Sequence, residues 1–372
     1  MKNRSSRSLS HLACITLLLL MLAGSFLAGI VFQKSGGLSK LRLALAFTSA
    51  SQPVAAPTEA PEPTQQPDQE SIRQALTINP NRVSLNQVDL MSRPAGEYAF
   101  LAAGHVYGRP GEEHPHPAST FVEMVPTINA MDLDMLFLLG DTVPNPSMVY
   151  LEQLESSVLD RLEMPVYNAV GNHDVRDRAF YEQRYGPTYY TFQHGPAAFI
   201  ILDTEIDPGK ITESQKAFFE QAIEAALSDP QVKFFFVMMH KVLFIPAETI
   251  TALFESGVAA AAPNAKENYG DPNFDSILNE TLVPAARQKP VYLVAGDVGA
   301  WGGNFSPYYQ KHPDVDLTML AAGFGDTEQD AALWVRYNSE QVEIGFIHPN
   351  GQPVVDYSEK DLNYYLAKLP SP

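Results

Sequence analysis

Short apolar runs alternate with segments of helical period from about residue 95 onward, and this alternation constrains the fold more than any other feature of the sequence. In the segment from Met148 to Leu162, for example, apolar residues recur on one helical face. Strands that alternate with helices form βαβ units, so the sequence predicts an α/β fold with a parallel or mixed sheet covered by helices on both faces. The runs are Tyr98–Ala103, Leu133–Leu139, Val166–Val170, Ala197–Leu202, Phe234–Met239 and Val291–Ala295.

Three later apolar runs, Leu317–Ala321, Leu333–Tyr337 and Val342–Ile347, leave little room for helices between them. They predict antiparallel strands of a second sheet. Between the two groups, the pattern from Thr212 to Gln215 is typical of a capping box and predicts the start of a helix. The buried positions of that helix would include Phe219, Ile223 and Leu227.

The chain before residue 76 has the composition of an anchor and a spacer. Residues 12–32 carry no charge and are long enough to cross a hydrocarbon core of about 30 Å. Basic residues precede this run, and no clear A-x-A cleavage site follows it, so we expect a single-pass signal anchor with the domain outside the cytoplasm. Secretion after signal cleavage is the alternative. The expected organisation is an anchor at 1–33, a Pro-rich disordered linker at 34–75, a folded domain at 76–350 and a tail at 351–372.

Charge and cysteine content exclude several classes of site. The formal net charge is −18, which repels polyphosphate backbones and makes nucleic acid an unsuitable partner. The single cysteine, Cys14, lies inside the apolar run, so no disulfide framework or CxxC zinc site can form. Any metal would therefore be held by histidine, asparagine and carboxylate side chains.

Five of the apolar runs end in a polar signature. In open α/β sheets, ligands bind outside the carboxyl ends of the strands, so these signatures are expected to converge. Histidine, asparagine and aspartate together favour a divalent cation such as Mn, Fe or Zn. The signatures are AGHVYG, GDT, GNHD, MMHK and AGDVGA, and their candidate side chains are His105, Asp141, Asn172, His173, His240 and Asp297.

The order of these signatures resembles the calcineurin-like metallophosphoesterase superfamily, whose pattern is DxH, GDxx, GNH(E/D), H and GHxH. The segment from Phe180 to Phe219, which contains FIILDT, resembles the stretch that follows GNHD in that family. The resemblance covers roughly residues 95–340. It implies a two-sheet β-sandwich flanked by helices in four layers, αββα, and metal-dependent hydrolysis of phosphoesters.

Two ligands of the family pattern are missing, and a third is replaced. Ala103 stands where DxH has its aspartate, and Gly299 stands where GHxH has its second histidine. Both losses fall on the same metal, for which only His105 and the bridging Asp141 remain. The resemblance implies that the other metal keeps four ligands, so we expect about one divalent cation per chain. Those ligands would be Asp141, Asn172, His240 and Asp297, with a carboxylate in place of the last imidazole.

The resemblance also implies roles in catalysis. His173 would protonate or stabilise the leaving oxygen, and Asp174 would orient His173. Candidates to replace the missing ligands are His114 and His116, in a loop after the first signature, and Tyr107. Asp203 and Asp326 also follow apolar runs and are expected to serve caps and turns.

Two hypotheses follow for function. The first is a metal-dependent phosphoester hydrolase acting outside the cytoplasm on a small phosphoester or on a phosphorylated glycan or lipid, tethered to the membrane by the N-terminal helix. The alternative is a catalytically inactive scaffold or binding protein of the cell envelope that retains the fold. The sequence contains neither a GxSxG elbow nor a Walker P-loop, which excludes the serine hydrolases and NTPases that depend on them.

Overall fold

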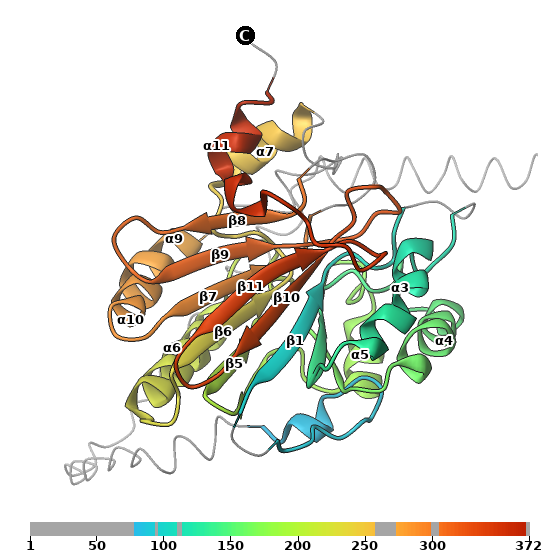
Figure 1. Ribbon diagram of the computed structural model, residues 1–372, viewed down its shortest axis with the longest axis horizontal. Helices are drawn as coiled ribbons and strands as arrows, with labels where there is room; N and C mark the ends of the chain where they lie inside the picture. The colour runs from blue at the N-terminus through green and yellow to red at the C-terminus, as the bar shows by residue number, and fades with distance from the viewer. Residues whose placement is uncertain (1–77, 94–95, 110–113, 257–272, 299–304, 370–372) are drawn as a thin grey trace, which may run out of the picture. The chain divides into compact units, whose positions relative to one another are not determined.

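The computed structural model describes residues 78–93, 96–109, 114–256, 273–298 and 305–369, and their strands form two sheets (Figure 1). One sheet has the order β11-β10-β1-β2-β3, and the other has the order β4-β5-β6-β7-β9-β8. The first contains β1 (Tyr98–Ala103), β2 (Met135–Leu138), β3 (Val166–Asn168), β10 (Ala332–Tyr337) and β11 (Val342–Ile347). The second contains β4 (Tyr190–His194), β5 (Ala197–Ile201), β6 (Phe234–Met239), β7 (Val291–Ala295), β8 (Tyr308–Lys311) and β9 (Leu317–Ala321).

Helices cover the outer face of each sheet (Figure 1). Against the first sheet lie α3 (Ser119–Ala130) and α4 (Met148–Ser157), with the short η2 (Leu159–Arg161) and α5 (Arg178–Tyr185) beside them. Against the second lie α6 (Glu213–Ser228), α7 (Ala247–Glu255), α9 (Phe274–Ile277), the π-helical turn η3 (Leu278–Leu282) and α10 (Val283–Ala286). The protein is therefore a mixed α/β structure with two sheets flanked by helices, as the resemblance implies. The expectation that helices cover both faces of one sheet was wrong, because the inner face of each sheet packs on the other sheet.

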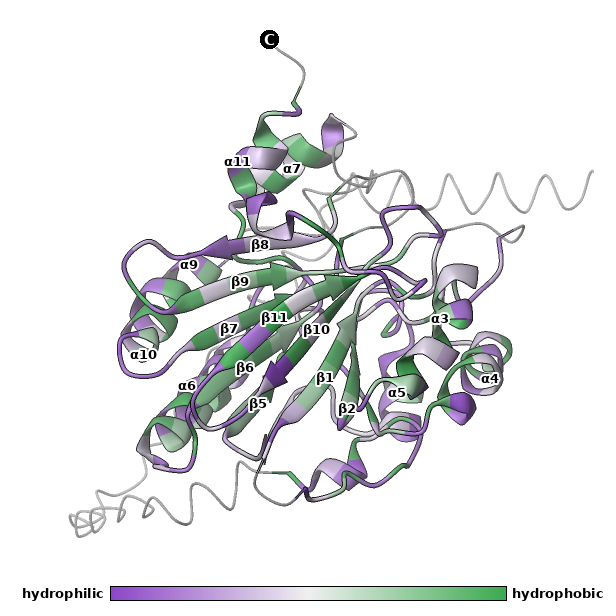
Figure 2. Ribbon diagram, viewed as in Figure 1, coloured by the Kyte–Doolittle hydropathy of each residue, from purple (hydrophilic) through white to green (hydrophobic). Residues whose placement is uncertain are grey.

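The inner faces of the two sheets share one aromatic core. Phe100 of β1 packs on Phe236 of β6 with ring centroids 5.0 Å apart, and Phe137 of β2 packs on Phe199 of β5 at 5.3 Å. All four side chains are buried. Each buried aromatic removes a large apolar area from water, and edge-to-face or offset pairs add further attraction. Figure 2 shows the same strands as predominantly hydrophobic. This core fixes the relative position of the strand ends that carry the polar signatures.

The prediction for the last three apolar runs was wrong in part. β10 and β11 are antiparallel, as expected, but they extend the first sheet, where β10 pairs with β1. β9 lies in the other sheet and runs parallel to β7. The chain changes sheets after β9, and Leu333, Val335 and Tyr337 of β10 then pack in the core between the sheets. β4 and β8 were not among the predicted strands.

The start of α6 was predicted correctly, but the capping box was not. Thr212 is the N-cap residue, yet its side chain makes no capping hydrogen bond. Gln215 is buried and bonds in another direction: its Nε2 donates to the carbonyl of Asp203, and its Oε1 accepts from the Asp203 N–H. Gln215 thus ties α6 to the end of β5. Of the predicted buried positions, Phe219 and Ile223 are buried and Leu227 is partly buried.

The structure describes the C-terminal end of the chain as far as residue 369, whereas at the N-terminal end it begins at residue 78. Residues 351–369, expected to form a tail outside the domain, pack on it through η4 (Tyr357–Glu359) and α11 (Leu362–Leu366). The buried Tyr365 donates its hydroxyl to the Pro307 carbonyl, which fixes this segment. The predicted anchor at 1–33 and the linker at 34–75 fall, with residues 76–77, outside the described residues. In the part of the chain that is described, no helix is long and apolar enough to cross a membrane. A short 3-10 turn, η1 (Pro80–Arg82), begins the described chain.

Candidate functional site

The loops after β1, β2, β3, β6 and β7 meet at one edge of the sandwich. The His105 N–H donates to the Gly140 carbonyl at 2.9 Å, which joins the loops after β1 and β2. The Gly296 N–H donates to the His240 carbonyl at 3.0 Å, which joins the loops after β7 and β6. A Cβ added at Gly104 would lie 2.1 Å from the Gly296 carbonyl oxygen, so only glycine permits this approach of the two sheets.

Two candidate ligands stand on strained backbone. His105 has a φ of 55° and Asp141 a φ of 52°, both in the left-handed region that side-chain-bearing residues rarely adopt. Such strain persists only where the surroundings fix it, and it is concentrated at functional sites. Gly140, at φ 83°, lies against His240: a Cβ there would be 2.3 Å from His240 Nδ1.

His240 lies between two carboxylates. Its Nδ1–H donates to the Leu139 carbonyl at 2.8 Å, which leaves Nε2 as the nitrogen with the lone pair in the neutral ring. Nε2 lies 3.6 Å from Asp141 Oδ1 and 3.8 Å from Asp297 Oδ1, is buried, and makes no hydrogen bond. Burial lowers the pKa of His240, but Asp141 and Asp297 together raise it above its ordinary value. The three side chains therefore need a proton or a cation between them.

His105 approaches Asp141 from the other side, with Nε2 3.6 Å from Asp141 Oδ2. Burial lowers the pKa of His105 to about 4, although Asp141 and Asp297 oppose the shift. Burial would raise the pKa of Asp141, but His240, His173 and His105 and the N–H bond from His173 hold it below its usual range. A neutral imidazole and an ionised carboxylate are the forms that bind metals.

The sequence analysis missed two charged residues at the site, Lys241 and Glu205. The ammonium nitrogen of the buried Lys241 lies 3.4 Å from Asn172 Oδ1, 3.4 Å from Glu205 Oε1 and 3.8 Å from Asp297 Oδ2. Burial lowers the pKa of Lys241, but Glu205 and Asp297 raise it above its ordinary value, so the amine is charged. The signal for Lys241 was present, since it follows His240 directly in MMHK.

The role predicted for Asp174 is corrected by its contacts. Its buried carboxylate accepts hydrogen bonds from the Thr142 N–H and hydroxyl at 2.8 and 2.7 Å and from the Gly171 N–H at 2.9 Å. It thereby joins the loops after β2 and β3. The His173 ring is oriented instead by the Pro144 carbonyl, 2.8 Å from Nδ1. A backbone carbonyl leaves no mark in a sequence motif, which is why the pattern pointed to Asp174.

Tyr107, one of the candidates for replacement ligands, packs against both His105 and His173. The Tyr107 ring lies 4.4 Å from the His105 ring and 4.8 Å from the His173 ring, between centroids. The Tyr107 hydroxyl is buried and has no hydrogen-bond partner. His116 Nδ1 lies 2.7 Å from the Tyr107 carbonyl, so the His114–His116 loop does reach the site edge. Gly299 lies outside the described residues. Metal binding by His114, His116 or Tyr107 stays a prediction.

The donor set fits one divalent cation in its chemistry. Among the described residues, no three or more histidine, cysteine or acidic side chains are arranged as ligands around one ion. They contact in pairs at 3.6–3.8 Å instead. Adjacent ligands that bind a cation at about 2.1 Å are about 3.0–3.4 Å apart, so the pairs need to close by only a few tenths of an ångström. The buried His240 Nε2, which faces two carboxylates without a hydrogen bond, is the atom that such a cation would engage.

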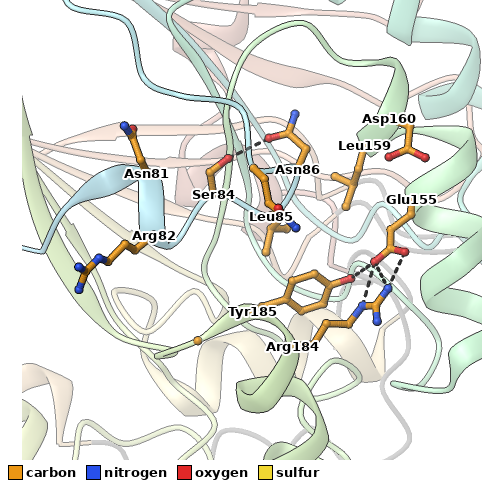
Figure 3. A pocket seen from close by; sticks show the side chains of 12 residues that line it. Asn81, Arg82, Ser84, Leu85, Asn86, Glu155, Leu159, Asp160, Arg184 and Tyr185 are labelled. Carbon is orange, nitrogen blue, oxygen red and sulfur yellow. Dashed lines mark hydrogen bonds and ion pairs between the residues drawn. The ribbon is translucent and has the colours of Figure 1, made fainter.

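A polar pocket of about 540 Å³ lies away from these loops (Figure 3). Its wall includes Leu85, whose N–H donates to the carbonyl of Val166 at the first residue of β3. The pocket therefore lies toward the amino end of that strand, whereas the candidate ligands follow the carboxyl ends. Two of its charged side chains, Arg184 and Glu155, bond to each other, as Figure 3 shows. None of the predicted site residues lines it.

The chain is similar to known proteins in structure only. No family model matches the chain, and no curated protein matches it. In structure it is similar to a purple acid phosphatase from yellow lupin (Lupinus luteus) seeds, with a TM-score of 0.49, 12% identity, and coverage of 71% of this chain and 54% of that one. The chain thus spans about half the length of the lupin protein.

Two shorter proteins are matched over nearly their whole length. A predicted phosphoesterase from Streptococcus pneumoniae has a TM-score of 0.33 and 12% identity over 71% of this chain and 96% of that one. Vps29 from Entamoeba histolytica has a TM-score of 0.30 and 8% identity over 70% and 94%. These three structures share at most 12% sequence identity with the chain.

Proposed function

We propose that this protein is a phosphoester hydrolase that works with one divalent transition metal, Mn, Fe or Zn, bound by Asp141, His240 and Asp297. One observation carries the proposal: His240 Nε2 is buried, makes no hydrogen bond, and faces a carboxylate oxygen on either side. The Leu139 carbonyl holds the ring so that this nitrogen points at the carboxylates. Asn172, the fourth ligand expected from the sequence, has its amide oxygen directed at Lys241, so its part in metal binding stays a prediction.

The chain's own residues supply the remaining chemistry. A bound divalent cation would withdraw charge from a phosphoryl oxygen and make water a better nucleophile. His173 is oriented by the Pro144 carbonyl, which leaves its Nε2 to carry a proton to the leaving oxygen. Arg176 lies 3.5 Å from that Nε2 and, with Lys241, places positive charge near a phosphoryl group in a strongly acidic chain.

The substrate class follows from the same chemistry and from the expected location. We propose a small phosphoester, or a phosphorylated glycan or lipid, hydrolysed outside the cytoplasm by a domain that residues 1–33 tether to the membrane. The uncharged run at residues 12–32 and the Pro-rich linker support this placement. Treating intact cells with protease should release the domain. Protection of the domain until the inner membrane is lysed would contradict the placement.

A non-catalytic role has its own supporting observation. Lys241 already directs a positive charge at Asn172 and Asp297, two of the ligands expected from the sequence. A site neutralised in this way could bind a partner or a ligand without turnover.

Turnover separates the two proposals. The full-length chain would be assayed on phosphomonoesters and diesters with Mn, Fe or Zn, beside the His173→Ala variant. Hydrolysis that depends on both the metal and His173 supports the enzyme. Absence of hydrolysis in a folded, metal-loaded protein favours the binding role.

A further inference from the structure

Lys241 lies inside a cage of oxygen atoms. Its ammonium faces an amide oxygen of Asn172, a carboxylate oxygen of Glu205 and a carboxylate oxygen of Asp297, at 3.4, 3.4 and 3.8 Å. Two carboxylates and one amide carbonyl are a set that hard divalent cations such as Mn²⁺ and Mg²⁺ bind. The cage therefore has the chemistry of a cation site, and a side-chain cation occupies it.

The cage is built rather than incidental. The side chains of Lys241 and Glu205 are 1% and 3% exposed, so their charges are held away from water. Burying a charge is costly unless it is paired and hydrogen-bonded. The Glu205 carboxylate is paired with Lys241 and accepts a hydrogen bond from the Thr204 hydroxyl at 2.9 Å. The Glu205 backbone is fixed by its N–H, which donates to Asp203 Oδ1 at 2.8 Å.

Asp297 joins this cage to the proposed metal position. Its Oδ1 faces His240 and its Oδ2 faces Lys241. A carboxylate that presents one oxygen to each of two positions can bridge two cations. Here one of the two positions contains the ammonium, which repels a second ion at such short range.

We propose that Lys241 takes the place of a second divalent cation, and that its charge is what limits the site to one metal. Calling this cation the second one rests on the proposed function, in which Asp141, His240 and Asp297 bind the first. The exclusion of a cation by Lys241 does not depend on that function. Removing the ammonium leaves Asn172, Glu205 and Asp297 facing a position of uncompensated negative charge, which a divalent cation would fill.

The test compares manganese content between variants of the full-length chain purified in detergent. Lys241→Ala, Lys241→Arg and wild-type protein would be dialysed against Mn²⁺ and analysed for metal. Lys241→Ala should contain about one more Mn²⁺ per chain than wild type. Lys241→Arg, which keeps the charge, should match wild type. Lys216→Ala is the matched control, because it removes a lysine paired with Glu220 on the surface.

Stability supplies a second readout. In EDTA, Lys241→Ala should melt below wild type because Glu205 and Asp297 lose their cation, and Mn²⁺ should recover most of that loss. If the variant folds only when Mn²⁺ is present during refolding, the proposal is also supported. A folded Lys241→Ala with the manganese content of wild type overturns it, as does a variant that Mn²⁺ neither folds nor stabilises. The wild-type content alone tests the proposed function, and the difference between variants tests Lys241.

Discussion

Two buried aspartates, Asp141 after β2 and Asp203 after β5, occupy similar places in the fold and have different surroundings. Both follow an apolar strand and both are at most 2% exposed. Asp203 accepts Arg178 Nη1 at 2.5 Å and the Glu205 N–H at 2.8 Å, and Gln215 satisfies its backbone. The Asp203 carboxylate, its backbone N–H and its backbone carbonyl therefore all have hydrogen-bond partners within the protein.

Asp141 has a different environment. It accepts the His173 N–H at 2.9 Å, but His240 Nε2 and the Tyr107 hydroxyl beside it are buried without hydrogen bonds in the described structure. Buried polar atoms are rarely left unsatisfied, because each costs about 1–3 kcal/mol. Burial and position along the chain therefore do not distinguish a structural aspartate from a ligand. What differs is that the His240 Nε2, 3.6 Å from Asp141, has no hydrogen bond.

The largest expected effect concerns turnover. His173→Ala should reduce phosphoester hydrolysis by about 10²–10⁴-fold, the usual size of a general acid's contribution. Metal content and melting temperature should change little, because the Asp174 bonds between the loops after β2 and β3 remain, as does the bond from the backbone N–H of residue 173 to Asp141. His312→Ala, a histidine whose Nδ1 accepts the Asp314 N–H in a separate turn, serves as the control. Equal loss of metal and fold in His173→Ala would make His173 structural.

The next effect separates the two aspartates directly. Asp203→Asn should lower the free energy of unfolding by about 2–4 kcal/mol, since it breaks an ion pair with one fully buried partner while Arg178 is partly exposed. Its metal content should equal that of wild type. Asp141→Asn should show the reverse: metal is lost, and metal-free stability stays within about 1 kcal/mol of wild type. Urea unfolding in EDTA measures both, and matching profiles for the two variants would abolish the distinction.

The smallest effect uses two tyrosine hydroxyls. Tyr190→Phe should cost about 1 kcal/mol, because its hydroxyl donates to the Asn168 carbonyl at 3.1 Å. Tyr107→Phe should leave the free energy of unfolding unchanged or raise it by up to about 1 kcal/mol, because its buried hydroxyl has no partner. A clear loss of stability in metal-free Tyr107→Phe would show that this hydroxyl is satisfied after all.

The sequence predicted the parts of the fold that depend on short-range residue patterns. β1, β6, β7 and β9 have the predicted bounds, because a buried strand is a continuous apolar run ended by turn residues. β11 also has the predicted bounds, although it is mostly part-exposed. Sheet membership was not predictable for β10, because an apolar run does not encode which neighbour it will join. β8 was missed because its pattern, YYQK, is short and half exposed.

The site was predictable where it depends on side chains at strand ends. His105, Asp141, His240 and Asp297 lie within 3.6–3.8 Å of one another in pairs, although they are spread from residue 105 to residue 297 of the chain. The group that orients the His173 ring is the backbone carbonyl of Pro144. The pairing of Lys241 with Glu205 connects the loops after β6 and β5. Neither contact follows from spacing along the chain, so both needed the structure.

Metal analysis of the full-length chain after dialysis against Mn, Fe or Zn tests the central claim most directly. Wild-type protein should retain about one ion per chain, with His105→Ala and Asp203→Asn close to it. His240→Ala and Asp297→Ala should retain none, because the cation then loses the imidazole nitrogen or one of its two carboxylates. A wild-type chain that retains no ion under saturating metal, or a His240→Ala variant that binds as well as wild type, would contradict the account.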